Sequence, residues 1–561
     1  MYLRTIGRRN KDGSEVRYVQ LAHNEWDPVR RCSVARVIHS FGREDRLDRA
    51  ALARLVRSLS RVLEPEPALI ATAPADLEFV RSVPLGGAWA LDGLWRRLGI
   101  DRAIERLLEA RRRDARAERL LFAMVANRAL APFSKLACCE WLAGDVAIPG
   151  LAADAPGEDP QPLYRAMDWL LEIEAPLAEQ VYWATADLLN LEVDLLFFDT
   201  TSTYFERDEP DTETVDEDGA AQPAFRAFGH SKDHRDELPQ ALIGMAVTRT
   251  GIPIRAWCWP GDSGEQPLIR QVKDELRDWK LSRVVWVADR GFQSAENRRY
   301  LQRAGGHYII GEKLRGESAE AKAALARQGR HRTAAGNLEV KEVRVDDGTM
   351  RDRFVICRNP DQAERDKAVR DRIVARLEQA IAGSDRLGAD ARAQLACRLQ
   401  AKRGLRRFLR QTPGGLLRID RAAVNAEQHL DGKFLLRSSD PTLTAEDIAL
   451  GCKQLLQVER GWRDMKTTLD PRPVHHRNED RIRAHVQLCW LALLLIRVAE
   501  NQTGDTWRNL RRELQRLHQG TFRGSAGLVD KTSEPTTAQL RILRALGVEP
   551  PPAFIALDLA A

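Results

Sequence analysis

The chain has 561 residues, which is too long for one ordinary hydrophobic core, so we expect three or four structural units. Its 87 Lys and Arg residues against 81 Asp and Glu residues give a net charge of +6, a mild excess that permits a polyanionic partner but does not require one. The apolar runs, such as Leu488–Ile496, are shorter than the roughly 20 residues of a membrane-spanning helix, and the first residues lack the apolar core of a signal peptide, so we exclude a membrane protein and expect a cytoplasmic one.

The first part of the chain is predicted to form a small unit of strands and one helix over residues 1–65. Apolar and polar side chains alternate in Glu15–Ala22, and Lys11–Ser14 has the composition of a hairpin turn. Leucines at helical spacing predict a helix over Leu47–Leu63. The Pro- and Ala-rich stretch Glu64–Asp76 predicts a linker to the next unit.

The next unit is predicted to be all-helical, because apolar stripes with a period of 3.6 residues recur from Val83 to Leu189. We place this helical domain at residues 80–190. Its arginine cluster at Arg96–Leu121 can bind a DNA backbone or form an ordinary solvated surface, and periodicity does not decide between them.

At Glu192 the pattern changes to that of an α/β core. Strands are predicted at Glu192–Ser202, twice within Ala241–Pro260, at Ser282–Asp289 and at His307–Leu314, with helices before and after the fourth strand. Three antiparallel strands followed by a crossover that returns the fourth strand parallel to the first is the order of the ribonuclease H fold. We therefore expect a ribonuclease H-like core over residues 191–315 and 443–530.

Residues 316–442 interrupt this core as an inserted mixed strand and helix subdomain. Strand patterns at Leu338–Val345 and Arg353–Arg358 precede a long charged helical stretch. Its basic cluster at Arg398–Gln411 is as compatible with a solvated helix face as with a DNA surface. After the insertion, a single helix is predicted over Ala445–Thr467, with Thr444 as its N-cap.

Three acids in these elements form a candidate metal site. Asp199 and Asp289 each end an apolar strand, and the predicted order makes these two strands neighbours. Glu459, Arg463 and Lys466 are spaced i, i+4 and i+7, so they share one helix face; an ordinary salt bridge is the alternative interpretation of that spacing. Three carboxylates of this kind suit two Mg²⁺ or Mn²⁺ ions that act on a phosphodiester.

Several longer motifs together resemble one family, the DDE transposases of bacterial insertion sequences, in the branch with an insertion between its second and third acids. The opening MYLRTIGRRNKDGSEVRYVQ is similar to the amino-terminal part of that group. The motifs that carry the resemblance are DTTSTYFE from Asp199, GHSKDHRDELPQ from Gly229, ADRGFQSAENRRYL from Ala288, YIIGEKLR from Tyr308 and VERGWRDMKTTL from Val458.

The resemblance implies that Asp199, Asp289 and Glu459 are the catalytic metal ligands. It also matches Lys466 to the lysine of the family's Y-R-E-K signature, which holds DNA near the scissile end. The tyrosine and arginine positions of that signature hold Cys452 and Leu455 in this chain. Arg463, on the same helix face, is a candidate to replace the missing arginine because guanidinium groups bind phosphate well.

The loop Gly229–Gln240 is a second candidate DNA contact. It presents His230, Lys232 and Arg235 just before a strand, and Arg290 directly follows the second acid. The alternative is a solvated approach to the hairpin; the resemblance favours a contact with the DNA backbone.

The remaining metal-binding residue types do not form a recognisable site. His475, His476 and His485 have no cysteine pair or H-E-x-x-H arrangement beside them, so we interpret them as structural or DNA-proximal rather than as zinc ligands. The eight cysteines show no C-x-x-C spacing, which is typical of reduced, packed thiols.

The resemblance therefore implies an enzyme that cuts the inverted-repeat ends of an insertion sequence and joins the freed 3′-hydroxyl ends to target DNA. Double-stranded DNA is the expected partner, and pairing of two ends implies a homodimer. Two alternatives remain: a metal-dependent nuclease on the same fold that does not join strands, and an inactive DNA-binding relic.

Overall fold

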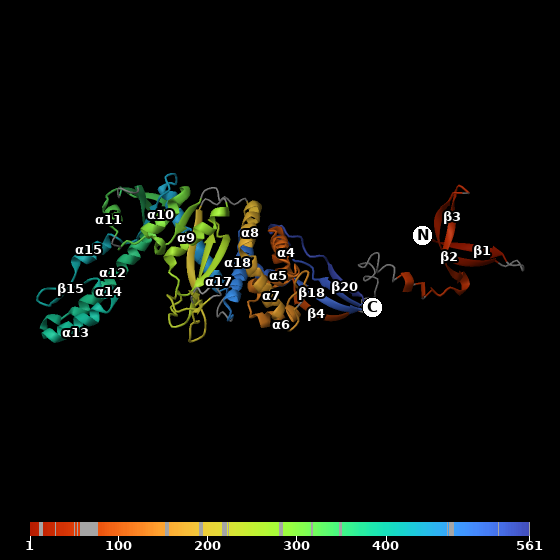
Figure 1. Ribbon diagram of the computed structural model, residues 1–561, viewed down its shortest axis with the longest axis horizontal. Helices are drawn as coiled ribbons and strands as arrows, with labels where there is room; N and C mark the ends of the chain where they lie inside the picture. Colours follow the sequence, from red (N-terminus) through yellow and green to blue (C-terminus); the bar gives the residue numbers. More distant parts are fainter. Residues whose placement is uncertain are drawn as a thin grey trace. The chain divides into compact units, whose positions relative to one another are not determined.

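In the computed structural model, which Figure 1 shows coloured along the sequence, the chain forms two compact units. Unit 1 comprises Met1–Ser82, Gln519–Glu534 and Pro551–Ala561, and unit 2 comprises Val83–His518 and Pro535–Pro550. The residues that the structure describes are 1–9, 15–28, 30–49, 51–52, 54–56, 77–151, 156–189, 195–215, 221–222, 224–279, 284–315, 318–346, 351–467, 469, 476–524 and 527–559.

Unit 1 contains two sheets, and the pairs β1–β2, β2–β3, β18–β19 and β19–β20 are antiparallel. The first has the order β1-β2-β3, and the second has the order β20-β19-β18-β4. The strands and the short helix of this unit are β1 (Tyr2–Arg9), β2 (Glu15–Asp27), β3 (Cys32–Arg43), η1 (Glu44–Arg46), β4 (Glu78–Pro84), β18 (His518–Gly524), β19 (Gly527–Thr532) and β20 (Phe554–Leu559).

The predicted amino-terminal strands are confirmed, and Arg9 lies opposite Glu15 in the first sheet. The predicted turn at 11–14, most of the predicted helix at 47–63 and the predicted linker at 64–76 lie outside the described residues. Strands from the end of the chain pair beside β4, which the local sequence patterns do not indicate.

Unit 2 begins with the helices that the periodicity predicts between Val83 and Leu189. Gly99 adopts a left-handed conformation with φ of +65° and makes the sharp turn between the first two of them. Ser134 caps the fourth by accepting a hydrogen bond from the Ala137 N–H at 3.2 Å. The helices are α3 (Gly86–Arg97), α4 (Ile100–Ala110), α5 (Ala117–Leu130), α6 (Lys135–Gly144), α7 (Gln161–Glu172) and α8 (Glu174–Leu189).

A nine-stranded mixed sheet forms the centre of unit 2, in the order β12-β13-β14-β17-β11-β10-β5-β8-β9. β10 lies between β5 and β11 and is parallel to both, whereas β8 is antiparallel to each of its neighbours, β5 and β9. The strands are β5 (Leu195–Tyr204), β8 (Gln240–Val247), β9 (Pro253–Pro260), β10 (Val285–Ala288), β11 (His307–Glu312), β12 (Arg332–Ala335), β13 (Leu338–Asp346), β14 (Arg351–Arg358) and β17 (Lys433–Ser438).

Short helices and one small hairpin connect these strands. The connecting elements are β6 (Thr214–Val215), β7 (Ala221–Gln222), α9 (Glu265–Glu275), η3 (Arg277–Trp279), η4 (Arg290–Phe292), α10 (Ala295–Gln302) and η5 (Arg303–Gly305).

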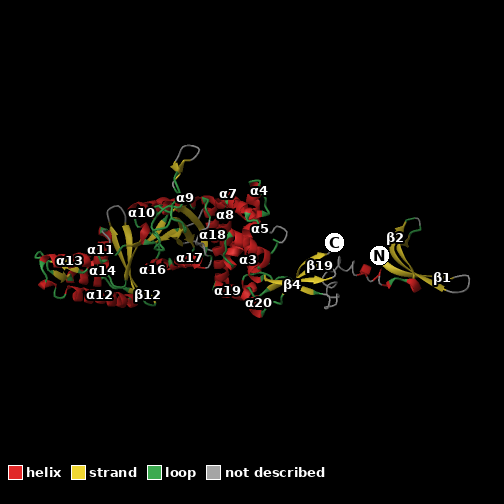
Figure 2. Ribbon diagram, turned by 90° about the horizontal axis from the view of Figure 1, so that it is seen from below, coloured by secondary structure: helices red, strands yellow, loops and turns green. Residues whose placement is uncertain are grey.

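The insertion has a strand part and a helical part (Figure 2). Its strands β12, β13 and β14 extend the central sheet through β17, so the insertion shares the sheet of the core instead of forming a separate one. The other elements are α11 (Ala319–Ala326), α12 (Pro360–Ile381), η6 (Ser384–Arg386), α13 (Ala389–Gln400), α14 (Arg403–Arg406), β15 (Leu409–Gln411), β16 (Leu417–Ile419) and α15 (Arg421–Gln428).

The prediction of a single helix over 445–467 is wrong, because the helix is interrupted near its centre. The structure has α16 (Ala445–Lys453) and α17 (Leu456–Thr467), separated by a turn at Gln454 and Leu455. α16 packs on β11, β14 and β17, whereas α17 packs on β5 and β8. A straight helix does not follow a twisted sheet over this width, and the turn lets both halves stay in contact with it.

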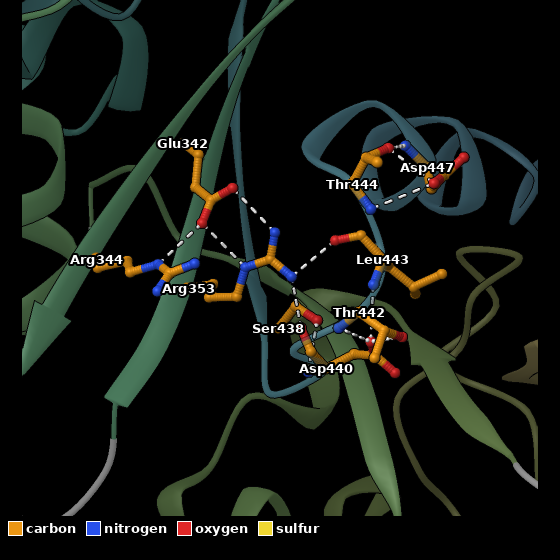
Figure 3. A network of polar contacts seen from close by, with 9 residues as sticks. All are labelled: Glu342, Arg344, Arg353, Ser438, Asp440, Thr442, Leu443, Thr444 and Asp447. Atoms are coloured by element: carbon orange, nitrogen blue, oxygen red, sulfur yellow. Dashed lines mark hydrogen bonds and ion pairs between the residues drawn. The ribbon is translucent and has the colours of Figure 1, made fainter.

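The beginning of α16 is fixed by a polar network (Figure 3). Thr444 is the predicted N-cap and forms a capping box with Asp447. Just before it, Arg353 of β14 donates to the carbonyl oxygens of Asp440 at 2.6 Å and Leu443 at 2.8 Å, and its guanidinium is held by Glu342 of β13. Two strands of the insertion therefore position the start of this helix.

The apolar run near residue 490 lies in α18 (Glu479–Thr503), a buried helix that packs on the sheet. α18 is long and apolar enough to cross a membrane, but 94% of its most apolar window is buried inside the protein, so it is a core helix. It contacts β9 and also α5 and α7, and one apolar cluster includes residues from the helices and from the sheet. The unit ends with α19 (Trp507–Leu514) and α20 (Thr537–Ala545).

The observed elements do not test the predicted domain boundaries at residues 65, 80, 190, 315, 442 and 530, which stay predictions.

Candidate active site

The first two predicted acids lie on neighbouring strands. Asp289 directly follows β10, as predicted, but Asp199 does not end its strand: it is the fifth residue of β5, which continues to Tyr204 because it stays paired with β8 after β10 has ended. Ala288 of β10 pairs with Phe198 of β5 in parallel register. Asp289 is the residue after Ala288, and Asp199 is the residue after Phe198. Parallel strands lie about 4.8 Å apart, so the two carboxyl groups share one edge of the sheet. Phe292 packs edge to face on Phe198, with ring centroids 5.4 Å apart, and closes the apolar layer beneath the acids.

Asp199 is a mostly buried carboxyl group, with 22% of its side chain exposed. Burial is the main cause that raises its pKa from the ordinary value of 3.8 to about 6, and the negative charges of Asp289 and Glu265 raise the pKa further. The Lys232 ammonium and the N–H of Thr200 act in the opposite direction. The site therefore places a mostly buried carboxyl group beside two further acids, of which Asp289 is exposed and Glu265 is half-buried.

Lys232 lies among these acids. Its ammonium nitrogen is 3.0 Å from Glu265 Oε1 and 3.8 Å from Asp199 Oδ1, and it donates to the carbonyl oxygen of Thr200 at 2.6 Å. The backbone N–H of Lys232 donates to Ser202 Oγ at 2.9 Å, which fastens the loop to β5. The lysine predicted to contact DNA thus neutralises the acid cluster in this structure.

Glu265 is a candidate functional residue that the sequence analysis missed. It lies in the first turn of α9. Its Oε2 is 3.7 Å from the position that a Cβ on Gly291 would occupy, and Gly291 is two residues after Asp289. An acid in the first turn of a helix is common because it complements the macrodipole. No local signal therefore distinguishes Glu265 from an ordinary helix-start acid.

Glu459, the third predicted acid, does not form a three-residue cluster with Asp199 and Asp289 in the described structure. It lies in the first turn of α17 and is exposed. Two residues farther on, Gly461 packs against Met245, which is the strand partner of Asp199, so α17 crosses the sheet beside the site. Within the described parts of the chain, however, no three His, Cys, Asp or Glu side chains are grouped closely enough to hold a metal ion.

The other predicted residues of α17 reach toward the same loop. Lys466 Nζ lies 2.9 and 3.1 Å from the two carboxylate oxygens of Asp233, the residue after Lys232. Arg463 is exposed on the same helix face. The face that carries Glu459 is thus tied at its far end to the loop that covers Asp199.

Two loop residues predicted to bind DNA lie at the surface. The His230 side chain is 84% exposed, and its Nδ1 lies 3.8 Å from Asp236 Oδ1. Arg235 forms an ion pair with Glu237 at 2.5 Å, and its guanidinium carbon lies 5.0 Å from the centre of the Tyr204 ring. Both side chains are accessible to a ligand.

Around the second acid, Arg290 is exposed and follows Asp289 in η4. Cys452, at the tyrosine position of the resembled signature, has its pKa raised to about 12 by burial and by the nearby charge of Asp289, so it is a neutral thiol. Leu455, at the arginine position, packs against the main apolar cluster. Neither residue supplies the polar group of the family pattern.

The histidines near residue 480 make packing contacts. The rings of His476 and His485 have centroids 5.3 Å apart, and His476 also packs edge to face on Tyr164. His475 lies outside the described residues. All eight cysteines are free thiols.

The carboxylates of Asp199, Asp289 and Glu265 are donors that fit a divalent cation. Carboxylate oxygens are the ligands that Mg²⁺ and Mn²⁺ prefer, and a cation beside Asp199 would compensate the charge that burial disfavours. In this structure the Lys232 ammonium partly has that role.

Comparisons with known proteins agree on one family. The family model described as "Transposase DDE domain" matches residues 214–495, a stretch that contains Asp289 and Glu459 and begins after Asp199. The model described as "IS1634 family transposase, N-terminal domain" matches residues 3–69.

Among solved structures, one titled "Cryo-EM structure of piggyBac transposase synaptic complex with hairpin DNA (SNHP)" is similar over 78% of this chain and 82% of that chain, with 9% sequence identity and a TM-score of 0.34. No curated protein matches the chain.

Proposed function

The chain belongs to the DDE transposases of insertion sequences, and from this premise we propose that it cuts the phosphodiester bonds at the inverted-repeat ends of its element and transfers the 3′-hydroxyl ends to target DNA. The observation that carries the proposal is the pairing of β5 with β10, because it sets Asp199 and Asp289 side by side at one edge of the sheet. We interpret the surrounding strands as a ribonuclease H-like core.

We assign Asp199, Asp289 and Glu459 as the residues that hold two Mg²⁺ or Mn²⁺ ions. When bound, such ions polarise the scissile phosphodiester and stabilise the leaving oxygen. The protein supplies the fixed carboxylates, and no covalent enzyme intermediate is required.

Glu459 and Glu265 are the two candidates for the third acid. Glu265 is already engaged by the Lys232 ammonium at 3.0 Å. Glu459 has no ion-pair partner among the described residues, and it shares a helix face with Lys466, which reaches the loop over Asp199. We therefore assign Glu459 as the ligand and Glu265 as the residue that positions Lys232.

The cationic side chains around the acids would hold the DNA backbone. Arg463 and Lys466 lie on the α17 face, Arg290 and His230 are exposed, and Arg235 is half-buried. Lys232 would first neutralise the acids and then, with the ions in place, be available to a phosphate oxygen. The amino-terminal unit and the α3–α8 helices would recognise the repeats, and pairing of two ends would require a homodimer.

The test is an in vitro reaction of the full chain with Mg²⁺ and a DNA duplex that ends in the element's inverted repeat. Asp289→Asn should lower cleavage by at least about 10²-fold, because it removes charge at the strand end. Asp390→Asn, an exposed acid at the start of α13, is the matched control and should cut like the wild type.

Joined products separate transposition from simple cleavage. The proposal predicts that the freed 3′ ends become attached to a second DNA. Cleavage without any joined product would support a nuclease instead, and no cleavage by the wild type would support an inactive relic.

A second comparison tests the assignment of the third acid. Glu459→Gln should lose cleavage to the same extent as Asp289→Asn, whereas Glu265→Gln should keep a measurable part of it. The opposite ranking would make Glu265 the ligand.

A further inference from the structure

The helical part of the insertion is unusually basic. Residues 382–421 contain ten Lys and Arg residues against three Asp residues. This part has its own apolar core, which includes Leu377, Leu399 and Phe408, and that core is separate from the main one. Its surface charge therefore lies on a small, independently packed scaffold.

Four arginines of this scaffold line one open hollow of about 590 Å³. We call Arg386, Arg410, Arg418 and Arg421 the arginine cradle. They come from η6, from the hairpin β15–β16 and from the start of α15. Gly383, with φ of +73°, makes the left-handed turn after α12 that brings η6 to the hairpin.

The cradle holds more positive charge than its own acids balance. Arg418 donates to Asp385 at 2.8 and 2.9 Å, and Arg421 donates to Glu378 at 2.8 Å. In the continuous described stretch 351–467, the side chains of Arg386 and Arg410 have no hydrogen-bond or ion-pair partner. At least two guanidinium groups thus face the hollow without a carboxylate.

The hairpin even places two of these charges directly opposite each other. Arg410 and Arg418 are cross-strand partners in the β15–β16 ladder. Their neighbours Leu417 and Ile419 belong to the small apolar core, so by the alternation of a strand the two arginines share the other face. Like charges in this position destabilise a hairpin, and an anion bound between them removes that cost.

The chemistry of the cradle fits phosphate groups better than a protein surface. Guanidinium groups bind phosphate through paired hydrogen bonds. Protein interfaces need an apolar centre, and the large apolar residues exposed over 360–431 are Val369 and Leu387 alone, in a stretch that the structure describes throughout. We propose that the arginine cradle binds the phosphate backbone of DNA, an inference that rests on the proposed function and adds a contact outside the catalytic site.

The experiment measures DNA binding by the full chain as a function of salt. The double variant Arg386→Ala, Arg410→Ala keeps Arg418 and Arg421, so Asp385 and Glu378 retain their partners. It should weaken binding by the same factor for a repeat-ended duplex and a random-sequence duplex, and the slope of log affinity against log salt should shrink by about 2. Arg410→Lys, which keeps the charge, should keep its part of the slope.

Arg365→Ala is the matched control, because Arg365 is an exposed arginine on α12 whose backbone lies about 24 Å along the helix from the cradle end. An unchanged slope in the double variant, or an equal loss in the control, would overturn the proposal; the first result would point to an acidic protein segment as the occupant.

Cleavage by the wild type is measured in parallel. If the wild type cuts and the double variant binds normally, the cradle fails alone, whereas a wild type that neither binds nor cuts DNA contradicts the proposed function itself.

Discussion

At the scale of single residues, Asp199 is subject to opposing influences. Its strand buries it, and two other carboxylates lie close enough to oppose its ionisation, while Lys232 favours the charged form. The balance leaves its pKa near 6, above the ordinary value of 3.8. A group that the fold keeps in an unfavourable charge state is typical of a site that binds a partner of opposite charge.

This shift predicts a pH dependence of stability in the absence of divalent ions. The pKa of Asp199 is higher in the folded chain than in the unfolded chain, so the folded chain binds more protons between about pH 4 and pH 6. The contribution of Asp199 to the free energy of unfolding therefore falls as the pH rises through this window. Above the window this contribution is lost completely. Asp199→Asn should remove this fall and be more stable than the wild type at neutral pH, by on the order of 2 kcal/mol.

Urea unfolding of both proteins at the two ends of the window measures this difference. Asp390→Asn should reproduce the wild-type pH dependence, since Asp390 is an exposed acid of the insertion. Parallel pH curves for the wild type and Asp199→Asn would contradict the interpretation.

At the scale of elements, the start of α16 depends on the strands of the insertion. Arg353 is 9% exposed at its side chain and satisfies two carbonyl oxygens in the turn that leads into the helix (Figure 3). Arg344 donates to the same Glu342, but its side chain is 76% exposed. The two arginines therefore form a matched pair, one structural and one at the surface.

We predict that Arg353→Met destabilises the protein by roughly 2–4 kcal/mol, because it leaves buried carbonyl groups without donors. Amide hydrogen exchange should become faster around Thr444–Ile448, at the first turn of α16. Arg344→Met should change neither quantity noticeably, because exposed ion pairs contribute little. Equal effects of the two substitutions would show that the network does not hold the helix.

At the scale of the whole molecule, α18 joins the helices and the sheet of unit 2 into one core. Its side chains are buried over most of its length, and it packs on α5, α7 and β9. The α3–α8 helices therefore share an apolar cluster with the sheet, although their sequence pattern is uniformly helical. Substrate recognition by these helices and chemistry at the sheet edge would share one scaffold.

Leu491→Ala tests this shared core, because Leu491 is fully buried in α18. The cavity should cost about 2–5 kcal/mol. Hydrogen exchange should then speed up in α5 and in β9 together, since one apolar cluster includes both. Faster exchange in only one of these elements would indicate two separate cores.

The sequence by itself determined the helices between Val83 and Leu189, the strands of the core and the strand order that makes β5 and β10, and with them Asp199 and Asp289, neighbours. Periodicity is a local property, and few connections are possible once strands and helices are assigned. The family resemblance is likewise written in contiguous motifs, and the match to the two family models confirms it.

Only the tertiary structure decided which other charges surround these acids. The contact of Glu265 with Lys232 joins residues 33 positions apart, and the pairing of Arg410 with Arg418 depends on a hairpin register. Neither contact produces a periodic pattern in the sequence. The turn between α16 and α17 is likewise a tertiary feature, because it separates a helix that packs on β11, β14 and β17 from one that packs on β5 and β8. Contacts between distant residues have no local signal, which is why the charge balance of the site and of the arginine cradle emerged only from the fold.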